Sequence, residues 1–182
     1  GAGAAAVFVI VYISFMGYAG DRVTAWLHPE LDPGDTGYQI LQSLYAIGSG
    51  GLFGLGYGKS RQKYLYLPFQ YNDYIFAVIC EELGLVGAMA IVALFAVTIL
   101  RGYWIALNAR DRFSTVLAAG LVTLIAVQTI LNLCVVTNLL PSTGIALPFF
   151  SYGGTALAVN LGEMGIVLGI SRGRNRRKIQ EA

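Results

Sequence analysis

The chain has 182 residues, about the length of one ordinary domain, but its composition differs from that of a soluble domain. It is 56% hydrophobic with a mean hydropathy of +0.64, and only 12% of its residues are charged, against about 25% in soluble domains. This balance excludes a disordered chain and argues against a soluble enzyme. The net charge of +2 gives no bulk basicity that would indicate a nucleic-acid partner. We therefore predict an integral membrane protein.

Four apolar stretches are long enough to cross a membrane, which takes about 20 helical residues. They are continuous apolar runs rather than short alternating strands, so they favour an all-α, polytopic bundle over a barrel. The first run starts without an initiator Met or a signal-peptide pattern, and we interpret this end as a cut within a longer protein. The predicted helices cover about residues 1–20, 74–100, 113–137 and 146–171.

Basic residues give the predicted orientation. Arg101, Arg110 and Arg112 lie in or beside the short loop between the second and third helices, and five more basic residues fall in the tail, residues 172–182. The positive-inside rule places both regions in the cytoplasm. By alternation, the long segment 21–72 is extracytoplasmic.

This outer segment, about 50 residues long, is the most informative part of the chain. Apolar residues recur at helical spacing over Gly37–Ala46, which predicts a short interfacial or re-entrant helix. A glycine-rich loop follows, with five glycines in eleven residues. A loop of this length in a compact protein is usually functional.

Asp73 stands at the outer start of the second predicted helix. One interpretation is a helix-start carboxylate, stabilised by the positive end of the helix dipole. The other is a general base at the membrane surface, beside a basic loop.

Three further carboxylates fall inside predicted membrane helices. One continuous helix would place Glu81 and Glu82 about 12–14 Å beyond Asp73, and Glu163 lies one turn from Asn160. Ionisable groups inside a membrane usually face a protein interior or a polar cavity. They are either structural contacts between helices or parts of a proton or substrate pathway.

Three basic residues alternate along the outer segment: Lys59, Arg61 and Lys63. In an extended chain they would point to one side. They form either a solvated, headgroup-contacting loop or a phosphate-binding row.

Four motifs follow one another along the chain: Gly37–Gly54, Lys59–Pro68, Asp73–Gly84 and Leu140–Gly154. In this order they closely resemble the SEDS family (shape, elongation, division and sporulation). The second motif is more similar to the division and sporulation branch than to the elongation branch. Two departures stand out, since Tyr71-Asn72 replaces a His-Thr pair of many relatives and Thr143 replaces a Lys of some.

The resemblance implies the C-terminal part of a bacterial inner-membrane peptidoglycan glycosyltransferase that polymerises lipid II. It identifies Asp73 as the general base, with Tyr74 in place of the commoner Phe. Gln39, Gln42 and Ser43 match a family motif that orders the loop or touches sugar. Lys59, Arg61 and Lys63 would neutralise the departing diphosphate.

The resemblance also implies partners: lipid II and a lipid-linked glycan strand, a class B penicillin-binding transpeptidase, other division proteins and membrane lipids. No cofactor or metal site is expected, and a divalent-cation requirement stays open. A lipid II flippase or transporter and a non-catalytic divisome scaffold are the alternatives. We expect the chain by itself to be inactive, because family members place part of the active cavity in their N-terminal half.

Overall fold

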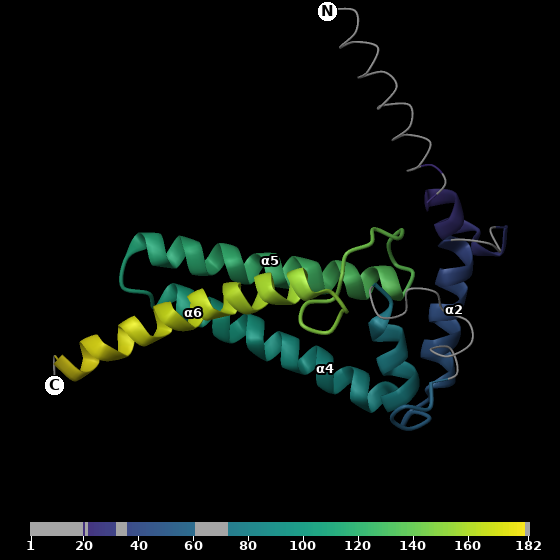
Figure 1. Cartoon of the computed structure of the whole chain (residues 1–182), viewed down its shortest axis with the longest axis horizontal. Helices are drawn as coiled ribbons and strands as arrows, with labels where there is room; N and C mark the ends of the chain where they lie inside the picture. Colours follow the sequence, from purple (N-terminus) through teal and green to yellow (C-terminus); the bar gives the residue numbers. More distant parts are fainter. Residues whose placement is uncertain (1–19, 21, 32–35, 61–72, 181–182) are drawn as a thin grey trace, which may run out of the picture.

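The computed structural model describes residues 20, 22–31, 36–60 and 73–180, with side chains described as far as residue 173. Throughout these ranges the regular elements are helical (Figure 1), as predicted. Most of the predicted first helix, residues 1–19, lies outside the described residues. The elements are η1 (Pro29–Leu31), α2 (Thr36–Ser49), α4 (Ile75–Leu107), α5 (Arg112–Val136) and α6 (Gly154–Gln180).

Three of these helices are long and apolar enough to cross a membrane: Ile75–Leu107, Arg112–Val136 and Gly154–Gly173. They confirm the predicted second, third and fourth helices, with two corrected bounds. The second helix continues to Leu107 rather than ending near residue 100. The fourth begins at Gly154 rather than near residue 146.

The late start of α6 has a local cause. Pro148 lacks an amide proton and disfavours helix at the residue before it. Gly144 (φ 68°) and Phe149 (φ 66°) take positive φ, which is incompatible with a right-handed helix. Residues 138–153 therefore form a loop, here called the α5–α6 loop.

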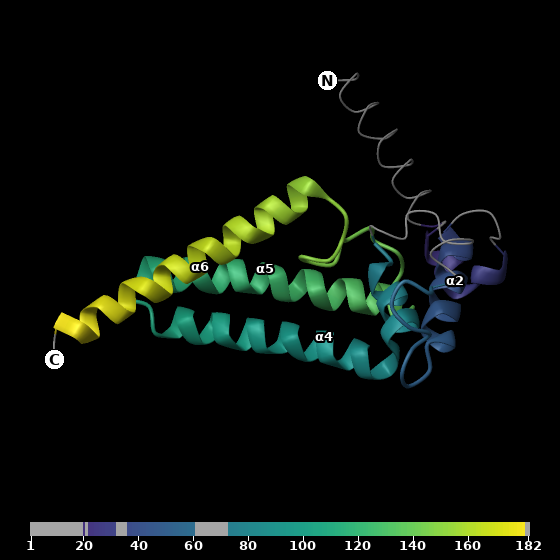
Figure 2. The same ribbon diagram turned by 60° about the horizontal axis from the view of Figure 1, so that its bottom comes forward.

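The three long helices lie side by side, and α2 lies across one end of them (Figures 1 and 2). A short turn joins α4 to α5. In this turn Asp111 caps α5, because its Oδ2 accepts a 2.9 Å hydrogen bond from the amide of Ser114. That backbone bond is the main reason why the pKa of Asp111 lies below its usual value.

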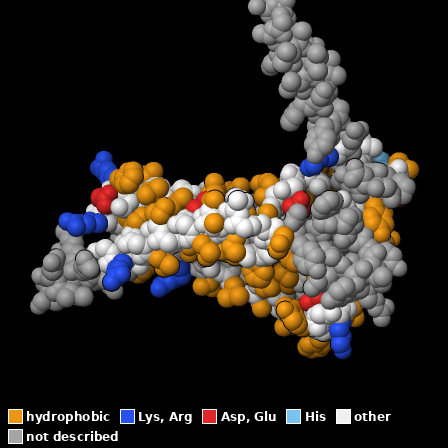
Figure 3. Space-filling view, in the orientation of Figure 1, with side chains coloured by type: hydrophobic (Ala, Val, Ile, Leu, Met, Phe, Trp, Pro, Cys, Tyr) orange, Lys and Arg blue, Asp and Glu red, His pale blue; other side chains and the backbone are white. Residues whose placement is uncertain are grey.

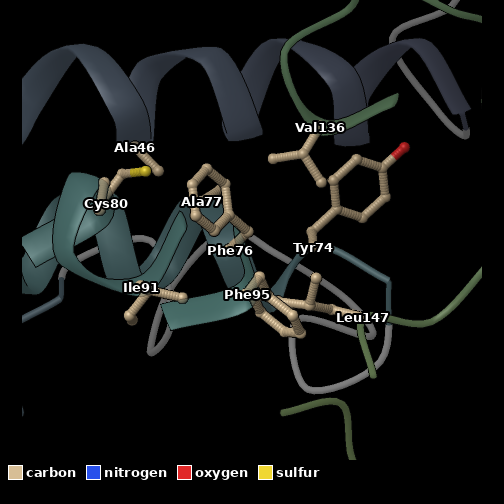
Figure 4. Close-up of a cluster of buried hydrophobic side chains, with 10 residues drawn as sticks. Ala46, Tyr74, Phe76, Ala77, Cys80, Ile91, Phe95, Val136 and Leu147 are labelled. Carbon is tan, nitrogen blue, oxygen red and sulfur yellow. The ribbon is translucent and has the colours of Figure 1, made fainter. Parts of the chain in front are cut away.

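Small side chains allow α2 to pack closely on α4. Ala46 of α2 and Ala77 of α4 are fully buried in one cluster (Figure 4). Tyr74, Phe95 and Val136 belong to the same cluster, so it joins α2, α4 and α5. Close approach of helices at small residues is the usual packing mode in membranes.

The helix α4 is broken at Gly84, where φ is 68° and ψ is −169°. The short part before the break lies beside α2, and the long part after it runs along α5 (Figure 1). The expectation of one continuous helix over residues 74–100 was therefore wrong, although Glu81 and Glu82 do lie further along the axis of the short part than Asp73. Both residues lie immediately before the break.

The glycine-rich loop supplies partners for the backbone groups that the break releases. The amides of Leu55 and Gly56 donate to the carbonyls of Glu81 (2.9 Å) and Glu82 (3.0 Å). In return, the amide of Leu85 donates to the carbonyl of Gly51 at 2.9 Å, and that of Val86 to Leu52 at 3.2 Å. These bonds matter because an unpaired backbone group inside a membrane costs several kcal/mol.

This exchange requires glycine on both sides. A Cβ atom on Gly54 would lie 2.2 Å from the carbonyl oxygen of Glu82, and one on Gly84 would lie 2.3 Å from the amide nitrogen of Gly54. A Cβ on Gly50 would lie 2.0 Å from the carbonyl oxygen of Cys80. Because the obstacles are backbone atoms, no rotamer change relieves them.

Large apolar side chains cover much of the outer surface of the long helices, whereas Lys and Arg gather toward the two ends of the molecule (Figure 3). This distribution suits a bundle surrounded by hydrocarbon along its middle. Exposed examples on α6 are Leu157, Val159, Leu161 and Leu168.

We predict that Gly84→Ala lowers the free energy of unfolding of the intact protein by at least about 2 kcal/mol, because alanine neither adopts this backbone conformation nor fits against the loop. Thermal unfolding in detergent measures the effect. Gly120→Ala is the matched control, since Gly120 lies in α5 with open space around it. It should be neutral or slightly stabilising. Equal stability of Gly84→Ala and wild type would contradict the account of the break.

Candidate functional site

The half-buried carboxylate of Asp73 lies in the turn before α4, under the α5–α6 loop. A Cβ atom on Gly144 would lie 3.6 Å from its Oδ2 atom, so the loop backbone passes directly beside the carboxylate. Gly144 has a positive φ, a conformation that a side chain would strain. The loop thus approaches Asp73 with no side chain of residue 144 between them.

Arg22 ties the N-terminal helical residues 22–27 to the same loop. Its Nη1 donates a 2.6 Å hydrogen bond to the carbonyl of Ser142, and the indole of Trp26 donates to the carbonyl of Asn138 at 2.9 Å. The guanidinium is close enough to act electrostatically on Asp73.

Two opposing effects set the pKa of Asp73. Burial raises it, because the ionised form loses solvation, and the positive charge of Arg22 lowers it. Burial dominates, so the pKa of Asp73 lies above the ordinary value for an aspartate. A raised pKa makes this carboxylate a stronger proton acceptor than an exposed one.

Two neighbours hold the loop against the start of α4. The buried Asn132 of α5 donates 2.8 Å hydrogen bonds from its Nδ2 to the carbonyls of Asp73 and Ile145. The buried Tyr74 donates a long bond, 3.5 Å, to Oγ of Ser142. Asp73 is therefore fixed through its backbone from one side and bordered by the loop on the other.

The predicted substrate-binding residues have different positions. Lys59 is exposed at the end of the glycine-rich loop, whereas Arg61 and Lys63 lie outside the described residues. Gln39 and Gln42 are half-buried on α2. Ser43 is fully buried and donates to the carbonyls of Ile40 (2.8 Å) and Val136 (3.4 Å), which favours the loop-ordering interpretation for it.

The three membrane carboxylates do not meet in one site. Glu81 accepts a hydrogen bond from the buried Ser60, which anchors the end of the glycine-rich loop. Glu82 and Glu163 are also buried, and among the described residues neither Oε1 of Glu82 nor Oε2 of Glu163 has a hydrogen-bond partner. Glu81 thus makes a structural contact, and the functional roles of Glu81, Glu82 and Glu163 stay predictions.

A cavity of about 460 Å³ lies between α5, the α5–α6 loop and α6. Its polar lining comes from Gln128, Thr155 and Asn160, and Ile145 belongs to its apolar lining. Since Gly144 borders Asp73, the α5–α6 loop borders both the carboxylate and this cavity.

Metal binding finds no support in the part of the chain that the structure describes. Within it, His, Cys, Asp and Glu side chains form no group of three that could hold an ion. The expected absence of a metal stays a prediction.

Sequence reasoning did not identify Arg22, Asn132, Ser142 or Gly144 as members of the site. Arg22 was visible as an unusual basic residue on the predicted outer side. Asn132 was visible as an amide inside an apolar helix, where polar residues are generally functional or structural. Their convergence on Asp73 depends on tertiary packing, which no local pattern shows.

Comparison with known proteins gives a family match and two similar proteins that belong together. The family model FTSW_RODA_SPOVE, described as cell cycle protein, matches residues 2–176. Stage V sporulation protein E of Bacillus subtilis is 50% identical over 155 residues, which cover 85% of this chain and 42% of that protein. "Probable peptidoglycan glycosyltransferase FtsW" of Trichlorobacter lovleyi is 45% identical over 166 residues, covering 91% and 44%.

A solved structure described as "Structural coordination of polymerization and crosslinking by a peptidoglycan synthase complex" contains a chain of the same fold. The TM-score is 0.70 at 28% identity, covering 94% of this chain and 48% of the other. The chain spans less than half of the length of each of these relatives.

We predict that Arg22→Gln raises the pKa of Asp73, because it removes the positive charge that stabilises the carboxylate. Infrared titration of the carboxylic-acid band, assigned by its loss in Asp73→Asn, measures the shift. Arg101→Gln is the control, since Arg101 is exposed near the other end of α4 and stacks on Trp104. An unchanged or lower pKa of Asp73 in Arg22→Gln would contradict this description of the site.

Proposed function

Because the chain belongs to the FtsW/RodA/SpoVE family of cell cycle proteins, we propose that the intact protein is a peptidoglycan glycosyltransferase that polymerises lipid II. The chain is a multi-pass inner-membrane protein, and three of its described helices are long and apolar enough to cross the membrane. We propose that the turn carrying Asp73 faces the extracytoplasmic side and that the C-terminus is cytoplasmic.

One observation carries the proposal: a half-buried carboxylate with a raised pKa lies at one end of the bundle, directly beside a glycine of the α5–α6 loop. A general base needs a pKa raised toward the working pH and room for the group that gives up its proton. Asp73 has a raised pKa, and Gly144 leaves open the space that a side chain would fill.

In the proposed reaction, the 4-hydroxyl of the acceptor GlcNAc attacks the anomeric carbon of the MurNAc at the lipid-linked end of the growing strand. The bond between this carbon and the diphosphate oxygen breaks, and the diphosphate leaves with the electron pair. Asp73 takes the hydroxyl proton as the new glycosidic bond forms. Arg22 helps to keep Asp73 ionised before this transfer.

The departing diphosphate develops negative charge, which cations stabilise. Lys59 is exposed at the end of the loop that caps the helix break, and we propose that it acts together with Arg61 and Lys63. The neighbouring solved structure is described as a peptidoglycan synthase complex. It supports a partner of the transpeptidase class for the intact protein.

We predict that Asp73→Asn reduces lipid II polymerisation by the intact protein, purified with its transpeptidase partner, by at least about 100-fold, because asparagine has the shape of aspartate but accepts no proton. Gel analysis of glycan strands measures the loss. Asp111→Asn is the control. Asp111 caps the N-terminal end of α5, which is the end away from Asp73, and asparagine is an equally good cap.

The same variant separates the enzyme from its alternatives. A flippase would keep much of its transport in Asp73→Asn, and a scaffold would keep its recruitment of partners. Undiminished glycan strands in Asp73→Asn would overturn the assignment of Asp73 as base.

We predict that Lys59→Ala raises the KM for lipid II about threefold to tenfold, because one of the cations that bind the diphosphate is lost. Arg61→Ala and Lys63→Ala should act in the same direction, and the triple variant should have the largest effect. Arg101→Ala, which removes an exposed charge near the other end of α4, is the control. If none of the three loop variants changes KM or kcat, the diphosphate is bound elsewhere.

A further inference from the structure

We propose that Asn132 is a positioning residue for the reaction: it sets the place of the Asp73 carboxylate relative to the α5–α6 loop. This inference rests on the proposed function, because it concerns the same carboxylate. Asn132 donates to the backbone carbonyls of Asp73 and Ile145 rather than to the carboxylate, so it acts through the backbone.

The side-chain amide of Asn132 connects two distant segments. Its Nδ2 donates to the carbonyl of Asp73, 59 residues away in sequence, and to that of Ile145, 13 residues away, both at 2.8 Å. Carbonyl oxygens only accept hydrogen bonds, so both must face the NH2 end of the amide. Each of the two amide protons therefore has its own acceptor.

The opposite end of the amide shows that this arrangement has a cost. Oδ1 of Asn132 is buried and has no hydrogen-bond partner among the described residues. Burying an unpaired acceptor is unfavourable, so an apolar side chain would suit this position better if packing alone mattered. The two donated bonds therefore explain why an amide side chain stands at this position.

Few other side chains could do the same. Aspartate would place a carboxylate oxygen, which only accepts hydrogen bonds, against the two carbonyl oxygens. Serine has one donor and is too short to reach both carbonyls. Leucine has nearly the shape of asparagine but no donor. The two bonds from Asn132, here called the Asn132 bridge, thus require a planar NH2 group at this distance from α5.

The bridge fixes the geometry that the chemistry needs. It holds the backbone of Asp73 and that of Ile145, the residue after Gly144, to one rigid helix. Gly144 in turn borders Oδ2 of Asp73. Without the bridge, the start of α4 and the loop can move apart, and a displacement of about 1 Å in an active site can cost about 100-fold in rate.

Loss of the bridge should also change how Asp73 titrates. Burial under the loop raises the pKa of Asp73, so a loosened loop exposes the carboxylate and lowers this pKa toward its ordinary value. The acid limb of the pH–rate profile then moves to lower pH. This direction is opposite to the shift expected for Arg22→Gln.

The test compares Asn132→Leu with wild type in the intact protein purified with its transpeptidase partner. We expect kcat for lipid II polymerisation to fall about 10- to 100-fold while KM changes less than about threefold, and the acid limb to move to lower pH. Thr129→Val is the matched control. Thr129 is buried about one turn away on α5, and its hydroxyl donates to the carbonyl of Ile125 in its own helix.

Asn132→Ser keeps the test decisive if the leucine variant does not fold, because serine is readily accommodated in membrane helices. Wild-type kcat and an unshifted acid limb in either folded variant would overturn the inference. The inference would also be overturned if kcat fell as much in Thr129→Val as in the Asn132 variants. Asp73→Asn is assayed in parallel: if it stays active, the proposed function fails, whereas an inactive Asp73→Asn with a fully active Asn132 variant refutes only the positioning role.

Discussion

The exchange of backbone hydrogen bonds between the broken helix α4 and the glycine-rich loop is the interaction on which the rest of the described structure depends. A break inside an apolar helix releases amide and carbonyl groups that hydrocarbon cannot satisfy. The carbonyls of Glu81 and Glu82 accept from the loop, and the amides of Leu85 and Val86 donate to it, so backbone groups on both sides of the break have partners in the loop. Glycine makes the contact possible, because a Cβ on Gly54 or Gly84 would overlap backbone atoms of the other segment.

The break determines where the candidate base lies. The short part of α4 packs on α2 instead of continuing the line of the long part, and Asp73 stands at its start. The cluster around Ala46, Ala77 and Val136 fixes this part against α2 and α5. Arg22 and Asn132 then bring the α5–α6 loop to the carboxylate from two directions. The described residues that precede Asp73, the helix break and Asp73 itself therefore form one structural unit. This explains why three of the motifs that carry the family resemblance lie far apart in sequence but together in space: Gly37–Gly54, Asp73–Gly84 and Leu140–Gly154.

The sequence was sufficient to predict the three long helices that the structure describes, because long apolar runs have few other stable structures in a membrane. It also indicated Asp73 as the candidate base, through a motif rather than through its surroundings, and this assignment stays a prediction. It was not sufficient for the break, since a single glycine such as Gly84 is tolerated in many helices and only its φ of 68° distinguishes it. The start of α6 was missed because the apolar run of residues 146–153 continues through a loop. For Ser43 the sequence left loop ordering and sugar contact as alternatives, and its burial with a hydrogen bond to the carbonyl of Val136 favours loop ordering.

The proposed reaction depends on Asp73 working as an ionised base whose pKa is raised by burial. Its most direct test is the pH–rate profile of lipid II polymerisation by the intact wild-type protein, compared with the infrared titration of Asp73 in the same preparation. The account predicts that the rate falls with decreasing pH at the pH where Asp73 becomes protonated, above the ordinary range of an aspartate. A rate that stays constant while Asp73 is protonated would contradict it.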